Sequence, residues 1–295
     1  MMNDLLHLQI GLTLWLQSIS PALDPIFQGI NLLQTQEFYL LALPIVWWCI
    51  DKRIGSSLVI LFLSSDYIVR VLKGLTSVPR PYQLDPRVRS LDPQPDASFP
   101  SAGTMTAVIL WGYLATQFRR RVLWVWAVAA IMLVALARVY LGAHYPTDVI
   151  ASILIGATIL ALVLGSNLAQ TIATAPHAGQ WFMAIVWPVA LAFIYLNGET
   201  AVTLGAMLGF GVGVLLEDRF VHFDPHGTAW KQLLKLALGL VVGLGLRFAI
   251  KPLLPLGNVS DIARYAVIGL WLGAGAPGTF VLMRLAKQRE RTSLV

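Results

Sequence analysis

The chain has 295 residues, of which 57% are hydrophobic and only 12% are charged, and its mean hydropathy is +0.71. This composition leaves too few charges to cover a soluble globule, so it excludes a soluble protein and predicts a multi-pass membrane protein. The net charge of +6 would suit an anionic partner, but basic membrane loops give the same excess. We therefore predict no nucleic-acid partner.

The cysteine and histidine content and the lengths of the apolar runs further restrict the class of membrane protein. The single cysteine, Cys49, excludes an internal disulfide and a cysteine metal cluster, and the five histidines have no metal-ligand spacing. We expect no metal and no cofactor. The apolar runs are roughly 15 to 23 residues long, which is the length of membrane helices rather than of barrel strands. The predicted fold is therefore all-α, a polytopic membrane helical bundle.

Residues 1–36 are expected to form N-terminal interfacial helices. The segment contains no Lys or Arg, and no secretory cleavage signal is visible in it. Apolar residues between Leu5 and Leu16 are typical of an amphipathic helix at the membrane interface, and a second short amphipathic piece follows Pro21. A first spanning helix in this segment is the alternative.

Nine crossings are predicted after this segment, with charged loops between them. Three basic groups fall on one face under this count: Lys52 with Arg53, the run 119–121, and a C-terminal tail. The tail contains Arg284, Lys287, Arg289 and Arg291. The positive-inside rule makes this face and the C-terminus cytoplasmic, so the loop 74–101 and the turn 140–147 share the extracytoplasmic side. The crossings are expected at about residues 37–51, 54–73, 102–118, 122–139, 148–166, 181–197, 200–217, 231–250 and 264–285.

The second crossing ends near Lys73, and Arg80 follows after six residues with a proline on each side. An arginine can hold two phosphate oxygens at once, and a lysine adds a compact positive charge. Both are candidate phosphate ligands, and snorkelling of the lysine to the interface is the structural alternative. We interpret the proline-rich loop that follows as a solvated lid or entrance whose mixed charges serve solubility. These charges are Asp85, Arg87, Arg89, Asp92 and Asp96.

The third crossing begins with Ser101, Ala102 and Gly103. Ser101 is a candidate N-cap, and the small residues after it let an anion approach unpaired backbone N–H groups at a helix start. Plain helix capping is the structural alternative. The predicted position of this segment, on the same side as Lys73 and Arg80, favours a phosphate site.

A polar stretch between two apolar runs contains Arg138, His144 and Asp148. Charged groups beside a bilayer are costly, which makes a functional site the default hypothesis. Pro146 suits the first turn of a helix, which places Asp148 in that turn. The carboxylate can then reach one imidazole nitrogen and leave the other free as a nucleophile or base. A hydrogen-bonded structural histidine at the interface is the alternative.

These three segments resemble the signature of the type 2 phosphatidic acid phosphatase family, membrane lipid phosphatases related to vanadium haloperoxidases. Order and spacing agree, with Ala137 in place of the serine that usually precedes the last motif. The resemblance covers about residues 54–166. The matching residues are Lys73, Arg80 and Pro81 in the first motif, Pro100 and Ser101 in the middle motif, and Arg138, His144 and Asp148 in the last.

The resemblance implies a phosphohistidine mechanism. His144 would attack phosphorus, and Asp148 would orient its imidazole. No metal would be required, because Lys and Arg side chains neutralise the phosphate charge. The residues implied to bind the substrate phosphate are Lys73, Arg80, Ser101, Ala102, Gly103 and Arg138.

The middle motif departs from the family at Gly103, where the family has a histidine that would protonate the leaving oxygen. General acid catalysis is typically worth on the order of 10²–10⁴ in rate, so an alkoxide would leave slowly without it, whereas a phosphate leaving group needs far less help. Three interpretations stay open. The chain is an enzyme restricted to diphosphates or using another proton donor, a binding protein without turnover, or an engineered chain that traps substrate.

The later crossings contain glycines at four-residue spacing, which is typical of closely packed helices. These crossings could shape a lateral lipid entrance or the contact of a homodimer. We predict one domain with three parts: interfacial helices 1–36, phosphatase-like core helices 37–167, and additional C-terminal helices 168–295. The spaced glycines are Gly205, Gly209, Gly213, Gly239, Gly243, Gly269 and Gly273.

The predicted function is hydrolysis of a lipid phosphate or lipid diphosphate, either a polyprenyl diphosphate or a phosphatidate-like lipid. We expect the site to face the extracytoplasmic side of a bacterial cytoplasmic membrane, whose lipids surround the chain. The competing class is a catalytically impaired lipid-phosphate binding protein, carrier or scramblase of the same fold. A transporter in the later helices has only their number in its favour.

Overall fold

The computed structural model describes residues 2–166, 171 and 174–289. Its regular structure in this described part is helical, apart from one isolated bridge between Phe223 and Gln288. The predicted all-α fold is therefore confirmed.

Backbone contacts divide the described chain into two units. Unit 1 falls within Met1–Tyr39 and Ile68–Ser166, and unit 2 falls within Leu40–Tyr67 and Asn167–Val295. The long helix α4 (Lys52–Thr76) therefore begins in unit 2 and ends in unit 1. The predicted boundary at residue 167 and the tail residue Arg291 lie outside the described residues, and the three-part division of the chain stays a prediction.

Six helical spans in the described residues are long and apolar enough to cross a membrane. The polytopic membrane bundle is therefore confirmed, while the count of nine crossings stays a prediction. The first predicted crossing corresponds to a shorter apolar helix, Gln36–Ile50, which comprises α3 (Gln36–Ile45) and a π-helical turn. The six spans are Arg121–Tyr140, Pro146–Gly165, His177–Ile194, Gly198–Val221, Ala229–Leu253 and Asn258–Leu282.

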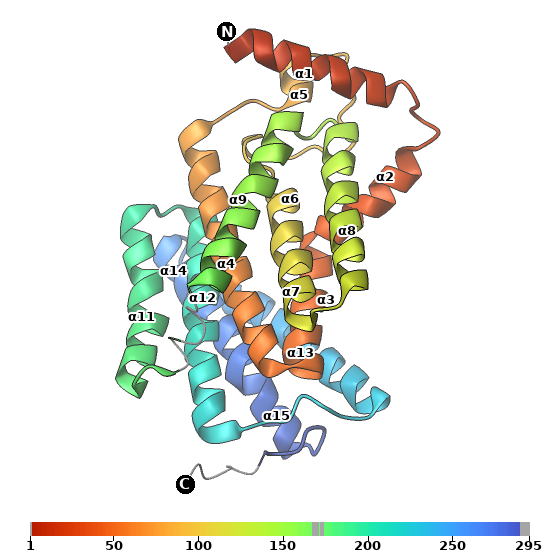
Figure 1. The fold of residues 1–295 in the computed structure, drawn as a ribbon. Helices are drawn as coiled ribbons and strands as arrows, with labels where there is room; N and C mark the ends of the chain where they lie inside the picture. The colour runs from red at the N-terminus through yellow and green to blue at the C-terminus, as the bar shows by residue number, and fades with distance from the viewer. Residues whose placement is uncertain (1, 167–170, 172–173, 290–295) are drawn as a thin grey trace. The chain divides into compact units, whose positions relative to one another are not determined.

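The centre of unit 1 is the helix that starts at the middle motif. It consists of α6 (Ala102–Ala107), a π-helical turn (Val108–Gly112) and α7 (Tyr113–Phe118). It packs against both α8 (Arg121–Tyr140) and α9 (Pro146–Gly165). Figure 1 shows that the polar turn joining α8 to α9 lies at the end of this bundle where α6 begins. Two of the three motifs are thus brought to one end of unit 1.

Helix α1 (Met2–Gln17) lies across this same end (Figure 1). Gln9, Thr13 and Gln17 share one helical face and are buried. The Gln9 side-chain oxygen accepts hydrogen bonds from the backbone N–H and the hydroxyl of Thr147, in the first turn of α9. The opposite face is apolar and exposed, as an interfacial helix requires, and its placement at the interface stays a prediction. That face contains Leu8, Leu12 and Trp15.

The Gln17 side chain ties α1 to the polar turn. Its amide nitrogen donates to the carbonyl of Tyr140 at 2.8 Å and to that of Arg89 at 2.9 Å, and its oxygen accepts from the Arg89 N–H at 2.9 Å. Replacing Gln17 with alanine leaves these backbone groups unpaired. We expect a loss of about 1–3 kcal/mol in unfolding free energy, measured as a lower unfolding temperature in detergent. The control Gln28→Ala changes an exposed side chain and should leave that temperature unchanged.

The rest of the N-terminal segment reaches the middle motif. Helix α2 (Asp24–Asn31) packs against α8, and the 3₁₀ turn that follows it (Leu32–Gln34) packs against α6. Residues far from the motifs in sequence therefore border them in space.

Unit 2 packs its helices around an aromatic cluster. Trp47, Trp48, Phe210, Phe223 and Phe280 are buried together. Trp47 and Trp48 both donate their indole N–H groups to one carbonyl, that of residue 272, at 3.1 Å. Apart from the ends of α3 and α4, the helices of unit 2 are α11 (His177–Ile194), α12 (Gly198–Leu216), α13 (Ala229–Ile250), α14 (Asn258–Leu270) and α15 (Ala276–Leu282).

The glycine spacing predicted close packing, and α12 and α14 confirm it. A Cβ atom at Gly209 would collide with the backbone carbonyl of Ala266, and one at Gly269 would lie 2.6 Å from the carbonyl of Ala206. Only glycine allows the two backbones to approach this closely, as in membrane helix pairs with small residues four apart.

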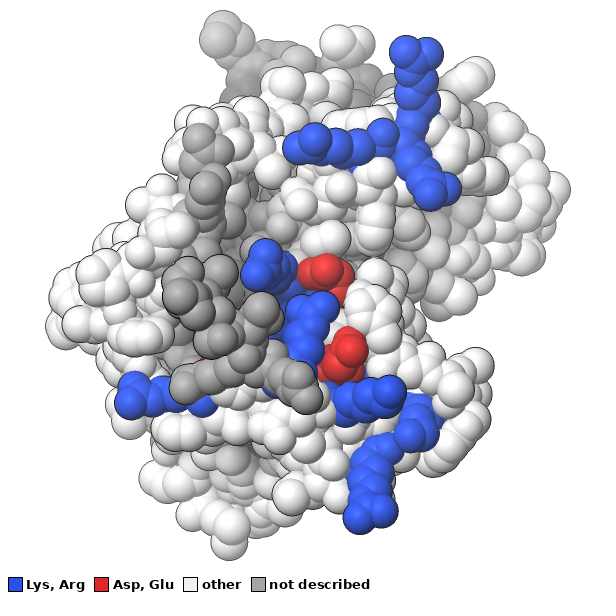
Figure 2. Space-filling view, turned by 60° about the horizontal axis from the view of Figure 1, so that its bottom comes forward, with Lys and Arg blue, Asp and Glu red and all other residues white. Residues whose placement is uncertain are grey.

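Basic side chains gather at one end of unit 2. Lys52 lies 3.1 Å from a carboxylate oxygen of Glu217, and Lys231 donates to the carbonyl of Arg284 at 2.8 Å. The start of α4 therefore meets the π-helical turn after α12 (Glu217–Val221), and the start of α13 meets the segment after α15. The tail joins them, because the Arg289 N–H donates to the carbonyl of His222 at 2.7 Å. Figure 2, in which the bottom of the Figure 1 view comes forward, shows more Lys and Arg side chains than Asp and Glu side chains on the visible face. Within unit 2, the basic loop near residue 52 and the described part of the tail thus share one end, as predicted.

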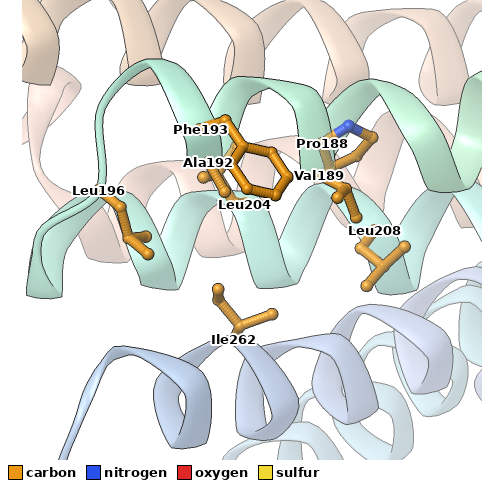
Figure 3. Close-up of a pocket in the computed structure, with 8 residues that line it drawn as sticks. All are labelled: Pro188, Val189, Ala192, Phe193, Leu196, Leu204, Leu208 and Ile262. Carbon is orange, nitrogen blue, oxygen red and sulfur yellow. The ribbon is translucent and has the colours of Figure 1, made fainter.

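A groove of about 290 Å³ lies between α11 and α12, with Ile262 of α14 at its floor (Figure 3). Its lining is apolar and includes Pro188, Phe193 and Leu204. Phe193 is almost fully exposed. The side chains that line the groove include no group that could bind or transfer a phosphate.

Candidate active site

Lys73 and Arg80 lie together in unit 1 and share one counter-ion. Lys73 is in the last turn of α4, and Arg80 immediately precedes the short helix α5 (Pro81–Leu84). Lys73 Nζ lies 3.0 Å from Oδ2 of Asp96, and Arg80 Nη2 lies 2.5 Å from Oδ1 of the same residue. Two buried cations thus converge on the two oxygens of one carboxylate.

The backbone of the same loop holds these two cations in place. Arg80 Nε donates to the carbonyl of Asp96 at 2.9 Å, and Lys73 Nζ donates to the carbonyl of Ala97. Arg80 Nη1 donates in addition to the carbonyl of Ala143, in the polar turn, at 2.7 Å. Arg80 therefore links the first motif to the last one.

Asp96 remains ionised in this environment. Burial acts to raise the pKa of the Asp96 carboxyl, but the positive charges of Lys73 and Arg80 outweigh it, so the pKa lies below its ordinary value. A carboxylate that holds its charge this firmly is a poor proton donor near neutral pH. Asp96 therefore does not suit the role of the general acid that the resemblance leads us to expect.

Arg138, at the end of α8, is the third buried cation of the cluster. Its Nη1 pairs with Oδ2 of Asp92 and donates to the side-chain oxygen of Asn31 at 2.8 Å. Its Nε is buried and has no hydrogen-bond partner among the described residues. Arg138 thus keeps one buried donor that no described residue uses.

The polar turn between α8 and α9 is compact and buried. Helix α8 ends where Gly142 adopts a φ of +74°, a left-handed conformation that favours glycine. A Cβ atom there would lie 2.6 Å from the carbonyl of Arg89. The chain then reverses so that the N–H groups of Ala143 and His144 both donate to the carbonyl of Arg138, at 3.1 and 3.2 Å. This turn fixes the imidazole relative to the guanidinium of Arg138.

The His144 imidazole faces Arg80. Arg80 Nη1 lies 3.3 Å from His144 Nε2. A guanidinium has donors only, so Nε2 is the acceptor and carries a lone pair, and the proton of the neutral ring is on Nδ1. His144 therefore presents a nucleophilic nitrogen toward the cation cluster.

Asp148 lies behind the imidazole, on the side away from Arg80. Its Oδ2 accepts from the hydroxyl of Ser98 at 2.5 Å and from the backbone N–H of Tyr145 at 3.0 Å. The same oxygen is 3.6 Å from His144 Nδ1, which has no hydrogen-bond partner among the described residues. Asp148 completes the capping box of α9, and a small shift of the ring would let it accept the Nδ1 proton as well.

The surroundings keep His144 neutral. Burial is the main cause that lowers the pKa of its imidazole well below the ordinary value, and the positive charges of Arg138 and Arg80 lower it further. A neutral ring is the form that can attack phosphorus. Among the described residues, no group of three or more His, Cys, Asp or Glu side chains is arranged to hold a metal ion.

The middle motif meets the N-terminal segment instead of a cation. Ser101 is buried and caps α6, and its hydroxyl lies 3.0 Å from that of Thr104. The space beside Gly103 is filled by the Gln34 side chain, whose amide oxygen a Cβ atom at 103 would strike. Gln34 Nε2 in turn donates at 3.0 Å to the same Asn31 oxygen that Arg138 contacts. Two amides thus connect the start of α6 to the cation cluster.

The structure thus places five of the predicted residues in one network of contacts: Lys73, Arg80, Arg138, His144 and Asp148. The side-chain amides of Asn31 and Gln34 connect this network to Gly103. The phosphate-binding roles of Ser101, Ala102 and Gly103 and the catalytic roles of the other residues stay predictions.

Sequence reasoning missed the carboxylates and amides of the cluster. The interpretation of Asp92 and Asp96 as solubility charges was wrong, because both pair with buried cations. Asn31, Gln34 and Ser98 were not singled out. One signal was available for Gln34, since a glycine where the family has a histidine leaves space that another side chain has to fill.

Two family models match the sequence. The PAP2 superfamily model matches residues 55–172, and the model for the transmembrane extension of PAP2 superfamily phosphatases matches residues 201–288. No solved structure matches the chain at a significant level.

Several curated proteins resemble the chain. Lipid phosphate phosphatase delta of Arabidopsis thaliana is 27% identical over 63% of this chain and 51% of its own length. An undecaprenyl-diphosphatase of Sulfolobus acidocaldarius is 34% identical over 37% of this chain and 52% of its own. Human sphingosine-1-phosphate phosphatase 2 is 25% identical over 66% of this chain and 52% of its own. The chain thus spans about half the length of each of these relatives.

The residues that the first PAP2 model covers include the whole set of motifs around Lys73, Ser101 and His144, and the second model covers most of the later helices of unit 2. With its six apolar spans, this is a multi-pass membrane protein. The family indicated by the three motifs is confirmed: the chain belongs to the PAP2 superfamily, with a PAP2 domain followed by the PAP2 transmembrane extension.

Proposed function

We propose that this protein is an integral membrane phosphatase that hydrolyses a lipid phosphate or lipid diphosphate through a phosphohistidine on His144. The observation that carries the proposal is the position of His144 Nε2, an unprotonated nitrogen 3.3 Å from Arg80, with Lys73 and Arg138 in the same cluster. A nucleophile beside three buried cations is the arrangement that phosphoryl transfer needs, since catalysis there is positioning plus charge stabilisation.

The proposed reaction has two steps. The Nε2 lone pair of His144 forms a bond to phosphorus while the bond from phosphorus to the leaving oxygen breaks. The leaving oxygen takes up a proton from water or, in a diphosphate, departs as part of the lipid monophosphate. Asp148 holds the Nδ1 proton and stabilises the charge that the ring gains. Water then attacks the phosphohistidine, and the P–N bond breaks to release inorganic phosphate and restore the free imidazole.

A lipid diphosphate is the preferred substrate in this proposal. With Gly103 and the Gln34 amide where the family has a histidine, and with an ionised Asp96, neither of these two positions supplies a proton to an alkoxide. A phosphate leaving group needs little protonation. The similarity to an undecaprenyl-diphosphatase supports a polyprenyl diphosphate, and the similarity to lipid phosphate and sphingosine phosphate phosphatases supports a monoester as the second choice.

The proposed location is a bacterial cytoplasmic membrane, with the cluster facing the extracytoplasmic side and the C-terminus in the cytoplasm. The basic end of unit 2 supports the cytoplasmic placement of the C-terminus, because short basic loops stay on the cytoplasmic side. The later helices are proposed to serve as a lipid entrance or a homodimer contact.

The proposal is tested by phosphate release from the purified full chain in detergent, with a polyprenyl diphosphate, phosphatidate and a sphingoid phosphate as substrates. We expect the diphosphate to be cleaved about 10²-fold faster than either monoester, because its leaving group needs no acid. Arg138→Gln should lower the rate about 10²-fold by removing a buried donor. The matched control Arg87→Gln alters an arginine that is mostly exposed and should leave the rate unchanged.

The competing proposal is a lipid-phosphate binding protein, carrier or scramblase, and the amide at the position of the acid favours it. In that case lipid diphosphates bind to the wild type but are not cleaved. Equal phosphate release from the wild type and from Arg138→Gln would also contradict the phosphatase proposal, since it would mark the release as background.

A further inference from the structure

The three cations of the cluster are covered on their solvent side by two carboxylates. The side chains of Lys73, Arg80 and Arg138 are 7%, 1% and 3% exposed, whereas those of Asp96 and Asp92 are 32% and 22% exposed. Each buried cation has one of these aspartates as its ion-pair partner. The aspartates therefore lie between the cations and water.

A carboxylate presents two oxygens to these donors much as a phosphoryl group does. Asp96 gives one oxygen to Lys73 and the other to Arg80, and Asp92 gives one to Arg138. Arginine and lysine hold phosphate oxygens with the same N–H groups. A phosphoryl group that binds these same N–H groups therefore competes with the two carboxylates for them, while Arg138 Nε remains as a further donor.

Such an exchange is feasible without unfolding the loop. The backbone carbonyls of Asp96 and Ala97 also accept from Arg80 and Lys73, so the loop stays anchored when the Asp96 side chain turns outward. The chain from residue 85 to 101 has no regular structure that such a rotation would break.

We propose that Asp92 and Asp96 are specificity-determining residues that compete with the substrate phosphate for Lys73, Arg80 and Arg138. The inference rests on the proposed function and adds a selection by charge. A diphosphate brings more negative charge than the two carboxylates it displaces, whereas a phosphodiester brings less. A terminal monophosphate brings roughly the same charge as the two carboxylates. The site therefore favours a diphosphate, tolerates a terminal monophosphate and rejects phosphodiesters, which make up most membrane phospholipids.

The test is binding of pyrophosphate and of dimethyl phosphate to the full chain in detergent, measured by calorimetry at low salt. Asp96→Asn removes the charge and keeps one acceptor oxygen, which can serve Lys73 or Arg80 but not both. We expect it to tighten pyrophosphate binding about tenfold or more and to bring dimethyl phosphate into a measurable range. Asp92→Asn should act in the same direction through Arg138. Asp85→Asn is the control, because Asp85 lies in the same loop and pairs with Arg87 instead.

The outcomes separate this inference from the proposed function. If Asp96 and Asp92 only brace the loop, their asparagine variants bind pyrophosphate no tighter than the wild type, which overturns the inference while the phosphatase stands. If the wild type and all variants fail to bind pyrophosphate, the phosphate site itself is absent and both proposals fail. Unfolding temperatures of the variants, measured in parallel, identify any variant that has lost its fold. If one aspartate variant is unfolded, pyrophosphate binding by the other aspartate variant decides between the outcomes.

Discussion

His144→Ala is expected to lower phosphate release from a lipid diphosphate at least about 10⁴-fold, because it removes the group that forms the bond to phosphorus. Substrate binding should change little by comparison, since the cations that would hold the phosphate are retained. Arg80 keeps its hydrogen bond to the carbonyl of residue 143 in this variant, which limits disturbance of the cluster. The effect should therefore fall on kcat rather than on KM.

Two further readouts separate a nucleophile from a structural histidine. Substrate labelled at the terminal phosphate and quenched in alkali should leave label on the wild type, because a P–N bond survives alkali, and none on the variant. The pKa of His144 is lowered by burial and by neighbouring cations, so the acid limb of kcat/KM should lie below about pH 6.5. As pH falls through that lowered pKa, the ring gains a proton and activity is lost.

The matched control is His177→Ala, which alters an exposed histidine at the start of α11. It should retain the full rate and the labelled intermediate. A labelled protein in the His144→Ala variant, or an unchanged rate, would show that phosphorus is attacked by another group, and the assignment of Nε2 as the nucleophile would then be wrong.

The helices of the site could be predicted because their signals are local. Apolar runs of membrane length predicted α8 and α9, and Pro146 predicted the start of α9. The order of Lys73, Arg80, Arg138 and His144 along the chain could be matched to a family, and their proximity followed from that match. The structure brings these four side chains into one cluster, while their roles await the measurements above.

The partners of these cations could not be predicted, for a physical reason. A mixed-charge loop without secondary structure has no periodicity, so nothing in its sequence tells which carboxylate meets which cation. Asp92 and Asp85 look alike in the sequence, yet one pairs with buried Arg138 and the other with exposed Arg87. The same holds for Asn31, which reaches Arg138 only because α2 packs against α8.

The role of Gly103, where the middle motif departs from the family, can be interpreted only with the structure. From the sequence alone, a histidine introduced at 103 would be expected to restore a proton donor. The structure changes that expectation, because the space is occupied: a Cβ atom at 103 would strike the amide oxygen of Gln34 and lie 2.8 Å from its Cδ and 3.0 Å from its Cβ. Gly103→His alone should therefore destabilise the protein by about 1–3 kcal/mol through overpacking and give little or no gain in rate.

Combining Gly103→His with Gln34→Gly should raise hydrolysis of a lipid phosphate monoester about 10²–10⁴-fold over the wild type, the usual contribution of general acid catalysis. Glycine rather than alanine is needed at 34, because the Gln34 Cβ is itself too close to a new side chain. Hydrolysis of a diphosphate should rise much less, since its leaving group needs little protonation. The gain should also fade above about pH 6.5, where an ordinary imidazole has lost the proton it would donate.

The control that isolates the proton is Gly103→Ala combined with Gln34→Gly, which opens the same space without an acid. This pair should remain as slow on monoesters as the wild type. If it matches the histidine pair, the gain comes from space rather than from a proton. If neither pair gains, Gly103 does not border the leaving group, because an imidazole placed there with room to turn would otherwise reach the departing oxygen. Only a gain specific to histidine, to monoesters and to acidic pH places residue 103 beside the bond that breaks.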